Sequence, residues 1–396
     1  MAVIRPFKGI FYNQEKIEIE KVVAPPYDII CEREVRHLCR QSAYNIVRLI
    51  AGRILPLPFA CPEKDRYTQA KELFYKWLKK GILIEADKPA IYIYRQDYSL
   101  PFPPFEKKSR IGFLCLLRLT EKGKGVFPHE ATFSFAVKDR QRLLEECKAN
   151  FSPIFGLYED KKERIREVIE GYLRRKEPEM DFYVDEIRHL LWTIEREEDI
   201  QKVITRMRGK PVFIADGHHR YTAALNFHQQ VRTKESSFVL LYLAEMREEN
   251  ISILPTHRIV FSEQKGIVEK IARFCQVERI QTLEEKNEQG IKMYYQGNYY
   301  LLLPSCSSSH PLFFLHQVLI RKALGIKAKE EKEKICYTHS VQEGLDLLRE
   351  REGIVFFVPS LRLEEIKKTI LKGENLPRKS TYFYPKLLTG LVMRRF

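Results

Sequence analysis

The sequence lacks the signals of several large protein classes. None of its eight cysteines forms a Cys-x-x-Cys pair, so neither a zinc ribbon nor a disulfide framework is predicted, and we expect reduced thiols in a cytoplasmic protein. No run of about eighteen apolar residues occurs, so no membrane span is expected. The first residues lack the apolar core of a secretory signal. Glycine-rich P-loop and Rossmann signatures are absent too, so a nucleotide site would not follow either pattern.

The composition is that of a globular protein with an excess of positive charge. The chain has 396 residues, 44% of them hydrophobic and 31% charged, which favours two or three domains. The net charge of +15 raises the question of nucleic acid as a partner. However, Lys and Arg alternate with Glu, as over 161–179. Neither a block of basic residues nor a nucleic-acid recognition helix is recognisable. We therefore do not expect nucleic acid, and the charge equally suits phosphorylated small molecules.

The order of apolar and turn-forming segments predicts three parts. Residues 1–105 would form an N-terminal α/β segment that ends in a Pro-rich linker at 101–105. Strands and helices alternate from 108 to 260, so 106–261 would form a core with a mixed sheet. Residues 262–396 would form a C-terminal α/β domain. The predicted fold class is therefore α/β or α+β, and a homodimer through the outer parts is left open.

The most informative stretch is 211–230, PVFIADGHHRYTAALNFHQQ. Its apolar start predicts a buried strand, Asp216-Gly217 a tight turn, and the remainder a helix. His218, His219 and Arg220 then stand at the helix N-terminus, where the helix dipole disfavours cations unless an anion is bound. In the structural alternative, Asp216 caps the helix and the basic side chains face solvent.

Three further pairs are candidates, and each has a structural alternative. A glutamate on a loop beside a phosphate site, as in His129-Glu130, can act as a general base, or it can be a surface residue. Tyr27-Asp28 follows two prolines in a stiff turn that either positions a ligand or caps a helix. His257-Arg258 could add to an anion site, although the pair is a weak signal by itself.

Several motifs together resemble a known family. They occur in the family's order and span nearly the whole chain: APPYDII, PHEATF with KDRQRLL, SPIFGLYED, ADGHHRYTAAL, LPTHRIV and KSTYFYPKLLTGL. This set resembles the domain-of-unknown-function family ten-fifteen of bacteria and archaea. The stretch from Gly217 to Ala223 also resembles the phosphate-holding turn of the ParB/sulfiredoxin superfamily. Sulfiredoxins carry a cysteine where this chain has His218, and no helix-turn-helix segment like that of ParB proteins is found.

Within that superfamily, the chain is similar to free serine kinases. These enzymes phosphorylate the hydroxyl of L-serine with ADP or ATP, and they pair a His-Glu loop with a D-G-H-H-R type turn. The resemblance implies a ParB/sulfiredoxin-like nucleotide-binding core and a small-molecule kinase that acts on a free amino acid, with L-serine as the leading acceptor. The alternative is a ParB-like nucleotide-binding switch or NTPase without a small-molecule acceptor.

The kinase hypothesis assigns a role to each candidate residue. The acidic and histidine residues proposed for catalysis are Glu130 as base, His129 and Asp216, with Asp216 also as the Mg²⁺ ligand. The donor phosphates would contact Gly217, His218, His219 and Arg220. The acceptor end would be lined by Tyr27, Asp28, His257 and Arg258.

Overall fold

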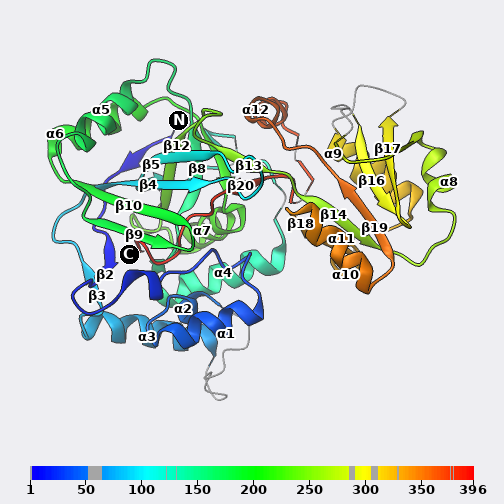
Figure 1. Ribbon diagram of the computed structural model, residues 1–396. Coiled ribbons are helices and arrows are strands. Elements are labelled where there is room, and N and C mark those ends of the chain that lie inside the picture. The colour runs from blue at the N-terminus through cyan, green and yellow to red at the C-terminus, as the bar shows by residue number, and fades with distance from the viewer. Residues whose placement is uncertain are drawn as a thin grey trace. The chain divides into compact units, whose positions relative to one another are not determined.

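The chain folds as two compact units. A computed structural model describes residues 2–51, 65–121, 123–130, 132–284, 290–304, 311–327, 330–374, 376–377 and 379–396. Unit 1 comprises Met1–Ser252 and Pro385–Phe396, and unit 2 comprises Ile253–Tyr384 (Figure 1). The C-terminal residues thus return to the first unit. These compact units divide the chain after residues 252 and 384, and the sequence-based division into 1–105, 106–261 and 262–396 stays a prediction.

Unit 1 is built on a nine-stranded sheet. Eight of its strands follow one another across the sheet, and β1 (Ile4–Arg5) pairs with β5 beside this path. The eight strands, in spatial order, are β6 (Val126–Phe127), β11 (Val212–Asp216), β8 (Ile154–Tyr158), β12 (Phe238–Glu245), β5 (Lys107–Arg118), β4 (Ile91–Ser99), β10 (Ile187–Ile194) and β9 (Met180–Val184).

The sheet is mixed, as the sequence predicted. β6 runs parallel to β11 and β8 runs parallel to β12, whereas the other neighbouring strands are antiparallel. The prediction that 101–105 is a linker between two parts of the chain is wrong. This Pro-rich segment joins β4 to β5, which pair directly from Tyr92↔Leu114 to Ser99↔Lys107, so it is the loop of a hairpin inside one sheet.

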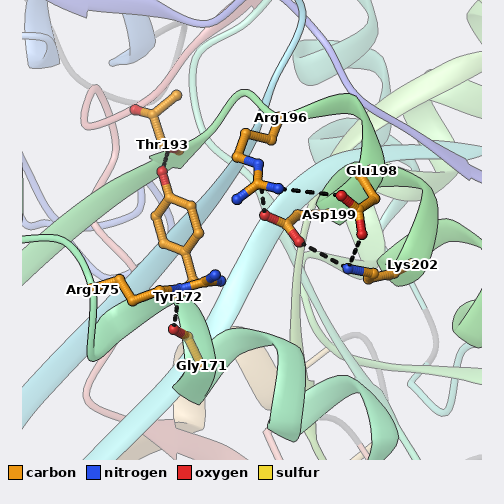
Figure 2. A network of polar contacts seen from close by, with 8 residues as sticks. All are labelled: Gly171, Tyr172, Arg175, Thr193, Arg196, Glu198, Asp199 and Lys202. Atoms are coloured by element: carbon orange, nitrogen blue, oxygen red, sulfur yellow. Dashed lines mark hydrogen bonds and ion pairs between the residues drawn. The ribbon is translucent and has the colours of Figure 1, made fainter.

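Helices cover the apolar face of this sheet. Side chains of α5 (Arg164–Leu173), α6 (Glu197–Met207) and α7 (His218–Val231) share one core cluster with residues of β4, β5, β10, β11 and β12. Burial of this apolar surface is the main source of stability for such a layer. Figure 1 shows α5 and α6 side by side. Helix α5 is tied to β10 because the Tyr172 hydroxyl donates to the Thr193 carbonyl (Figure 2).

The remaining elements of unit 1 are mostly N-terminal. Helix α3 (Arg66–Lys79) is amphipathic and buries Tyr67, Ala70, Phe74 and Trp77. The other elements are the 3-10 helix η1 (Ile19–Lys21), the helices α1 (Glu32–Gln41), α2 (Val47–Ile50), α3 (Arg66–Lys79) and α4 (Ser134–Cys147), and the short paired strands β2 (Ile10–Tyr12) with β3 (Leu83–Glu85) and β7 (Ala149–Asn150) with β21 (Arg394–Arg395).

Unit 2 contains a six-stranded antiparallel sheet with its own core. Its strands, in spatial order, are β15 (Cys275–Ile280), β17 (Asn298–Pro304), β16 (Ile291–Tyr295), β19 (Gly353–Phe357), β14 (His257–Phe261) and β18 (Ile335–Thr338). A separate pair, β13 (Ser252–Leu254) and β20 (Tyr382–Tyr384), lies where the chain enters and leaves this unit. Its helical elements are α8 (Ile267–Ala272), α9 (Pro311–Phe313), the π-helix η3 (Phe314–Ala323), α10 (Glu331–Lys334), α11 (Val341–Glu350) and α12 (Leu363–Leu371).

Candidate functional site

The strand, turn and helix expected at 211–230 are present. β11 ends at Asp216, and α7 begins at His218 after one glycine. Gly217 has φ 90° and ψ 27°, a left-handed conformation that side chains with a Cβ adopt only with strain. The helix buries Tyr221 and Ala224 against the sheet, whereas Leu225 and His228 are only half-buried. The free N–H groups at the start of α7 therefore lie directly beyond the end of a buried strand.

Sheet topology brings the His129-Glu130 loop to this turn. β6 and β11 are parallel neighbours, with Val126 opposite Val212, so the loops that follow their carboxyl ends meet at one edge of the sheet. The His129 backbone N–H donates to His218 Nε2 at 3.2 Å, and the Phe133 N–H donates to His219 Nε2 at 3.0 Å. Sequence reasoning proposed both segments for one site, and the structure places their histidines in contact.

These hydrogen bonds correct the expected charge at the turn. His218 and His219 each accept a bond at Nε2, so each is held as a neutral ring. Burial, with His129 close by, keeps the pKa of His218 well below 6.5, and burial lowers the pKa of His129 to about 4. Of the three basic residues expected at the helix start, Arg220 is therefore the one that carries a positive charge. Neutral imidazoles can still donate from Nδ1.

Asp216 lies between two cations. Its Oδ2 is 3.6 Å from the Arg220 guanidinium and 3.5 Å from Lys386 Nζ, and its Oδ1 accepts from the Gly217 N–H at 2.9 Å. Burial by itself raises the pKa of Asp216, but Lys386 and Arg220 outweigh it and hold the pKa below its ordinary value. The carboxylate is thus charged and neutralised by the protein. Arg220 also donates to the Pro153 carbonyl, before β8.

A magnesium ion does not fit the contacts of Asp216. The carboxylate oxygen that would coordinate Mg²⁺ faces two positive side chains, and its other oxygen accepts a backbone bond. Within the described part of the chain, no group of three or more His, Cys, Asp or Glu could hold a metal ion. Asp216 as a metal ligand stays a prediction, and we derive no step through a protein-held metal.

Glu130 follows His129 directly and is half-buried. Its backbone lies in the loop that contacts the start of α7, because its neighbour His129 is bonded to His218 there. The ring centroids of these two histidines are 4.6 Å apart and the rings are perpendicular. Glu130 is thus next in sequence to a residue of the turn's contact network, and its role as base stays a prediction.

The Tyr27 turn also reaches this region, through arginines. The Arg140 guanidinium lies 3.9 Å from the centre of the Tyr27 ring. Burial raises the pKa of Tyr27, while Arg140 and Arg220 oppose that rise. Arg140 and Arg220 line one small cavity of about 50 Å³ with Ile50. Asp28 is exposed.

The second His-Arg pair is in unit 2. Arg258 is fully buried on β14 and donates to the carbonyls of Thr256 and Lys379 and to His316 Nε2. His257 Nδ1 accepts from the Val358 N–H, and burial with the adjacent Arg258 lowers the pKa of His257 to about 4. Both side chains make internal contacts of unit 2, and their role at an acceptor site stays a prediction.

Two features of this region were missed in the sequence. Lys386 was noted only as part of a family motif, and its partner Asp216 is 170 residues away, so no local spacing could connect them. Arg140 pairs with Asp139, which accepts from the Tyr67 hydroxyl at 2.6 Å. Within the stretch KDRQRLL, an Asp-Arg pair in a helix with apolar neighbours is itself a signal of a buried ion pair.

These observations define a mixed α/β protein with a candidate anion site where two parallel strands end. The chain belongs to the family of proteins of unknown function DUF1015, whose model matches residues 4–348. The last motif of the resemblance, from 379 onward, lies beyond this match. No curated protein matches the chain. Among the described residues, no helix combines the length and apolar character needed to cross a membrane.

Several solved structures match the chain at low similarity. A conserved hypothetical protein from Pyrococcus furiosus is 14% identical, with 69% of this chain and 92% of that chain covered and a TM-score of 0.39. A variant of free serine kinase in complex with ADP is 15% identical, with 67% and 90% covered and a TM-score of 0.39. A C-terminally truncated SbnI from Staphylococcus aureus is 13% identical, with 70% and 85% covered and a TM-score of 0.40. Such values are too low to support a function, and the ParB/sulfiredoxin-like core stays a prediction.

Proposed function

We propose that this protein is a phosphotransferase that moves a phosphate from ADP or ATP to the hydroxyl of a free amino acid, with L-serine as the leading acceptor. One observation supports it most. The loop with His129 and Glu130 and the turn from Asp216 to Arg220 follow neighbouring parallel strands, and hydrogen bonds join them. A candidate base and a candidate phosphate site therefore lie at one edge of the sheet. The resemblance of both motifs to those of free serine kinases suggests which reaction this site would carry out.

The donor phosphates would lie at the start of α7. Backbone N–H groups there point out of the helix and favour anions. Gly217 has no Cβ to obstruct a phosphate, and an added Cβ would come within 3.0 Å of the Arg220 guanidinium. His218 and His219 would donate from Nδ1 without adding charge. In phosphoryl transfer, fixed donors of this kind stabilise the charge spread over the transferred oxygens.

The acceptor would approach from the Glu130 side. The serine hydroxyl oxygen forms the new P–O bond, the bond from the terminal phosphorus to its bridging oxygen breaks, and AMP or ADP leaves. The hydroxyl proton passes to Glu130. Tyr27 and Asp28 would border the acceptor from the N-terminal segment, and His257 and Arg258 remain acceptor-site candidates on the sequence motif alone.

The direct test is an activity assay. Purified protein is incubated with ADP or ATP, Mg²⁺ and a panel of hydroxyl amino acids, and phosphorylated products are measured by mass spectrometry. We expect O-phosphoserine as the main product. If none of the amino acids is phosphorylated, the proposal fails. Nucleotide hydrolysis that serine does not affect would instead support the nucleotide-binding switch or NTPase.

Glutamate variants locate the base. Glu130→Gln should lower kcat by about 10²- to 10⁴-fold, the usual contribution of a general base, and leave ADP binding unchanged. Glu121→Gln is the matched control, because Glu121 is an exposed glutamate of the preceding loop, paired with Lys124. Equal activity of the Glu130 variant and this control would remove Glu130 from the mechanism.

A further inference from the structure

The C-terminal segment that returns to unit 1 is held at its first two residues by buried side chains. The Arg110 guanidinium donates to the Pro385 carbonyl, and Gln96 Nε2 donates to the Lys386 carbonyl at 3.0 Å. Arg110 and Gln96 are both fully buried. They are directly opposite each other on β5 and β4, and Arg110 also donates to the Gln96 side-chain oxygen. Side chains of two adjacent strands thus clamp the backbone of 385–386.

Burial of the side chains that form this clamp costs free energy. A buried arginine loses its hydration, and it is retained where its donors have defined partners. Arg110 donates through Nη2 to the Pro385 carbonyl and to the Gln96 side-chain oxygen, and its guanidinium carbon lies 4.7 Å from the centre of the Phe155 ring. The Phe155 strand, β8, is the neighbour of β11, and Phe155 pairs in register with Asp216. The clamp therefore lies on the part of the sheet that leads to the 216–220 turn.

The clamped backbone places the positive charge of Lys386 beside that turn. Lys386 Nζ is 3.5 Å from Asp216 Oδ2, and the side chains of Lys386 and Arg220 are each only 12% exposed. With neutral imidazoles, the charges of Asp216, Lys386 and Arg220 sum to one net positive charge. Without Lys386, the sum would be zero. Lys386 thus decides whether the turn attracts an anion.

We propose that Lys386 is a phosphate-binding residue of the candidate site, and that Arg110 and Gln96 are positioning residues that hold it there. The inference rests on the proposed function, because it assumes that the donor phosphates bind at the 216–220 turn. Before the nucleotide binds, Lys386 neutralises Asp216. When phosphates arrive, the ammonium group contacts both the carboxylate and a phosphate oxygen, since it carries three donors.

Binding measurements without acceptor test this role. Affinities for ADP, pyrophosphate and adenosine are measured by calorimetry for the wild type, Lys386→Met, Lys386→Arg and the control Lys8→Met, which alters an exposed lysine of unit 1. We expect Lys386→Met to weaken ADP and pyrophosphate at least about tenfold, the effect of one charge-assisted hydrogen bond, with adenosine unchanged. Lys386→Arg keeps the charge and should retain most of the affinity, and Lys8→Met should match the wild type.

The outcomes separate this inference from the proposed function. If the wild type binds ADP and Lys386→Met binds it equally well, Lys386 is not a phosphate ligand and the proposed function stands. If the wild type binds neither ADP nor ATP, both proposals fail. Gln96→Met tests the positioning role: a weaker affinity for pyrophosphate with unchanged adenosine binding supports it, and equal loss for both ligands indicates a structural effect alone.

A measurement on the wild type covers the case in which the variants do not fold. Lysine acetylation by acetic anhydride is followed by mass spectrometry, with and without saturating pyrophosphate. Pyrophosphate should slow acetylation of Lys386 several-fold and leave Lys8 unaffected. Equal rates at Lys386 with and without pyrophosphate would overturn its assignment as a phosphate ligand.

Discussion

Two aspartates in unit 1 each lie at the start of a helix between two cations, and they differ in where the cations come from. Asp199 lies in the first turn of α6 and pairs with Arg196 at 3.7 Å and Lys202 at 3.4 Å, both within four residues of it (Figure 2). Asp216 precedes α7 and pairs with Arg220 and Lys386. The first cluster is local, and the second joins three distant parts of the chain if the loop of His129 is included.

The difference in exposure shows what each cluster does. The side chains of Arg196 and Lys202 are 62% and 42% exposed, so water screens them and they stabilise the helix start modestly. Lys386 and Arg220 are largely buried; Arg220 also donates to the Pro153 carbonyl, and the backbone carbonyl of Lys386 accepts from Gln96. Water-shielded charges that are fixed before a ligand arrives are the arrangement expected of a binding site.

The largest expected effect comes from removing each carboxylate charge. Asp216→Asn should lower the free energy of unfolding of unit 1 by about 3 kcal/mol, because two buried cations lose their partner. Asp199→Asn should cost about 1 kcal/mol or less, since its partners are solvated. Urea denaturation monitored by circular dichroism measures both. Equal losses would show that the exposure of the cationic partners does not set the cost of removing the carboxylate charge.

The next effect is a loss of folding stability at acid pH, which results from the neutral histidines near Asp216. The pKa of His129 is about 4 in the folded protein and about 6.5 when unfolded, so below pH 6.5 the unfolded chain binds a proton that the folded one does not. The stabilisation is complete above pH 6.5 and falls by up to about 3 kcal/mol as the pH drops to 4.

Variants isolate the contribution of His129 from other buried histidines. His129→Gln should make the stability curve shallower between pH 6.5 and 4 than in the wild type. Asp199→Asn should leave the slope unchanged, because the ion-pair partners of Asp199 are an arginine and a lysine rather than a histidine. Superimposable slopes for His129→Gln and the wild type would contradict the lowered pKa.

The smallest expected effect on stability concerns two glycines that precede helices. Gly217 and Gly266 both have positive φ, 90° and 67°, so alanine at either should cost about 1–2 kcal/mol. Only Gly217→Ala should also weaken ADP binding, because its Cβ would meet the Arg220 guanidinium at 3.0 Å. Calorimetry on both variants checks this, and an equal loss of affinity would argue against phosphate at α7.

Much of the local structure could be predicted from the sequence, and its assembly could not. The apolar run before Asp216, Gly217 and the spacing of Tyr221 and Ala224 predicted a strand, a turn and a helix, which the structure confirms. The protonation of the histidines could not be predicted, because it depends on which backbone N–H groups they meet. The hairpin at 101–105 was mistaken for a linker, since prolines occur in both and only strand pairing distinguishes them.

The sequence by itself determined the mixed α/β class, the family motifs and the residue types gathered at the turn, because these depend on composition and short spacings. The tertiary structure alone decided which residues meet. Parallel pairing of β6 with β11 brings His129 to His218, and the clamp of Arg110 and Gln96 carries Lys386 to Asp216. Charge and burial at the turn are sums over these distant partners, so no local pattern contains them.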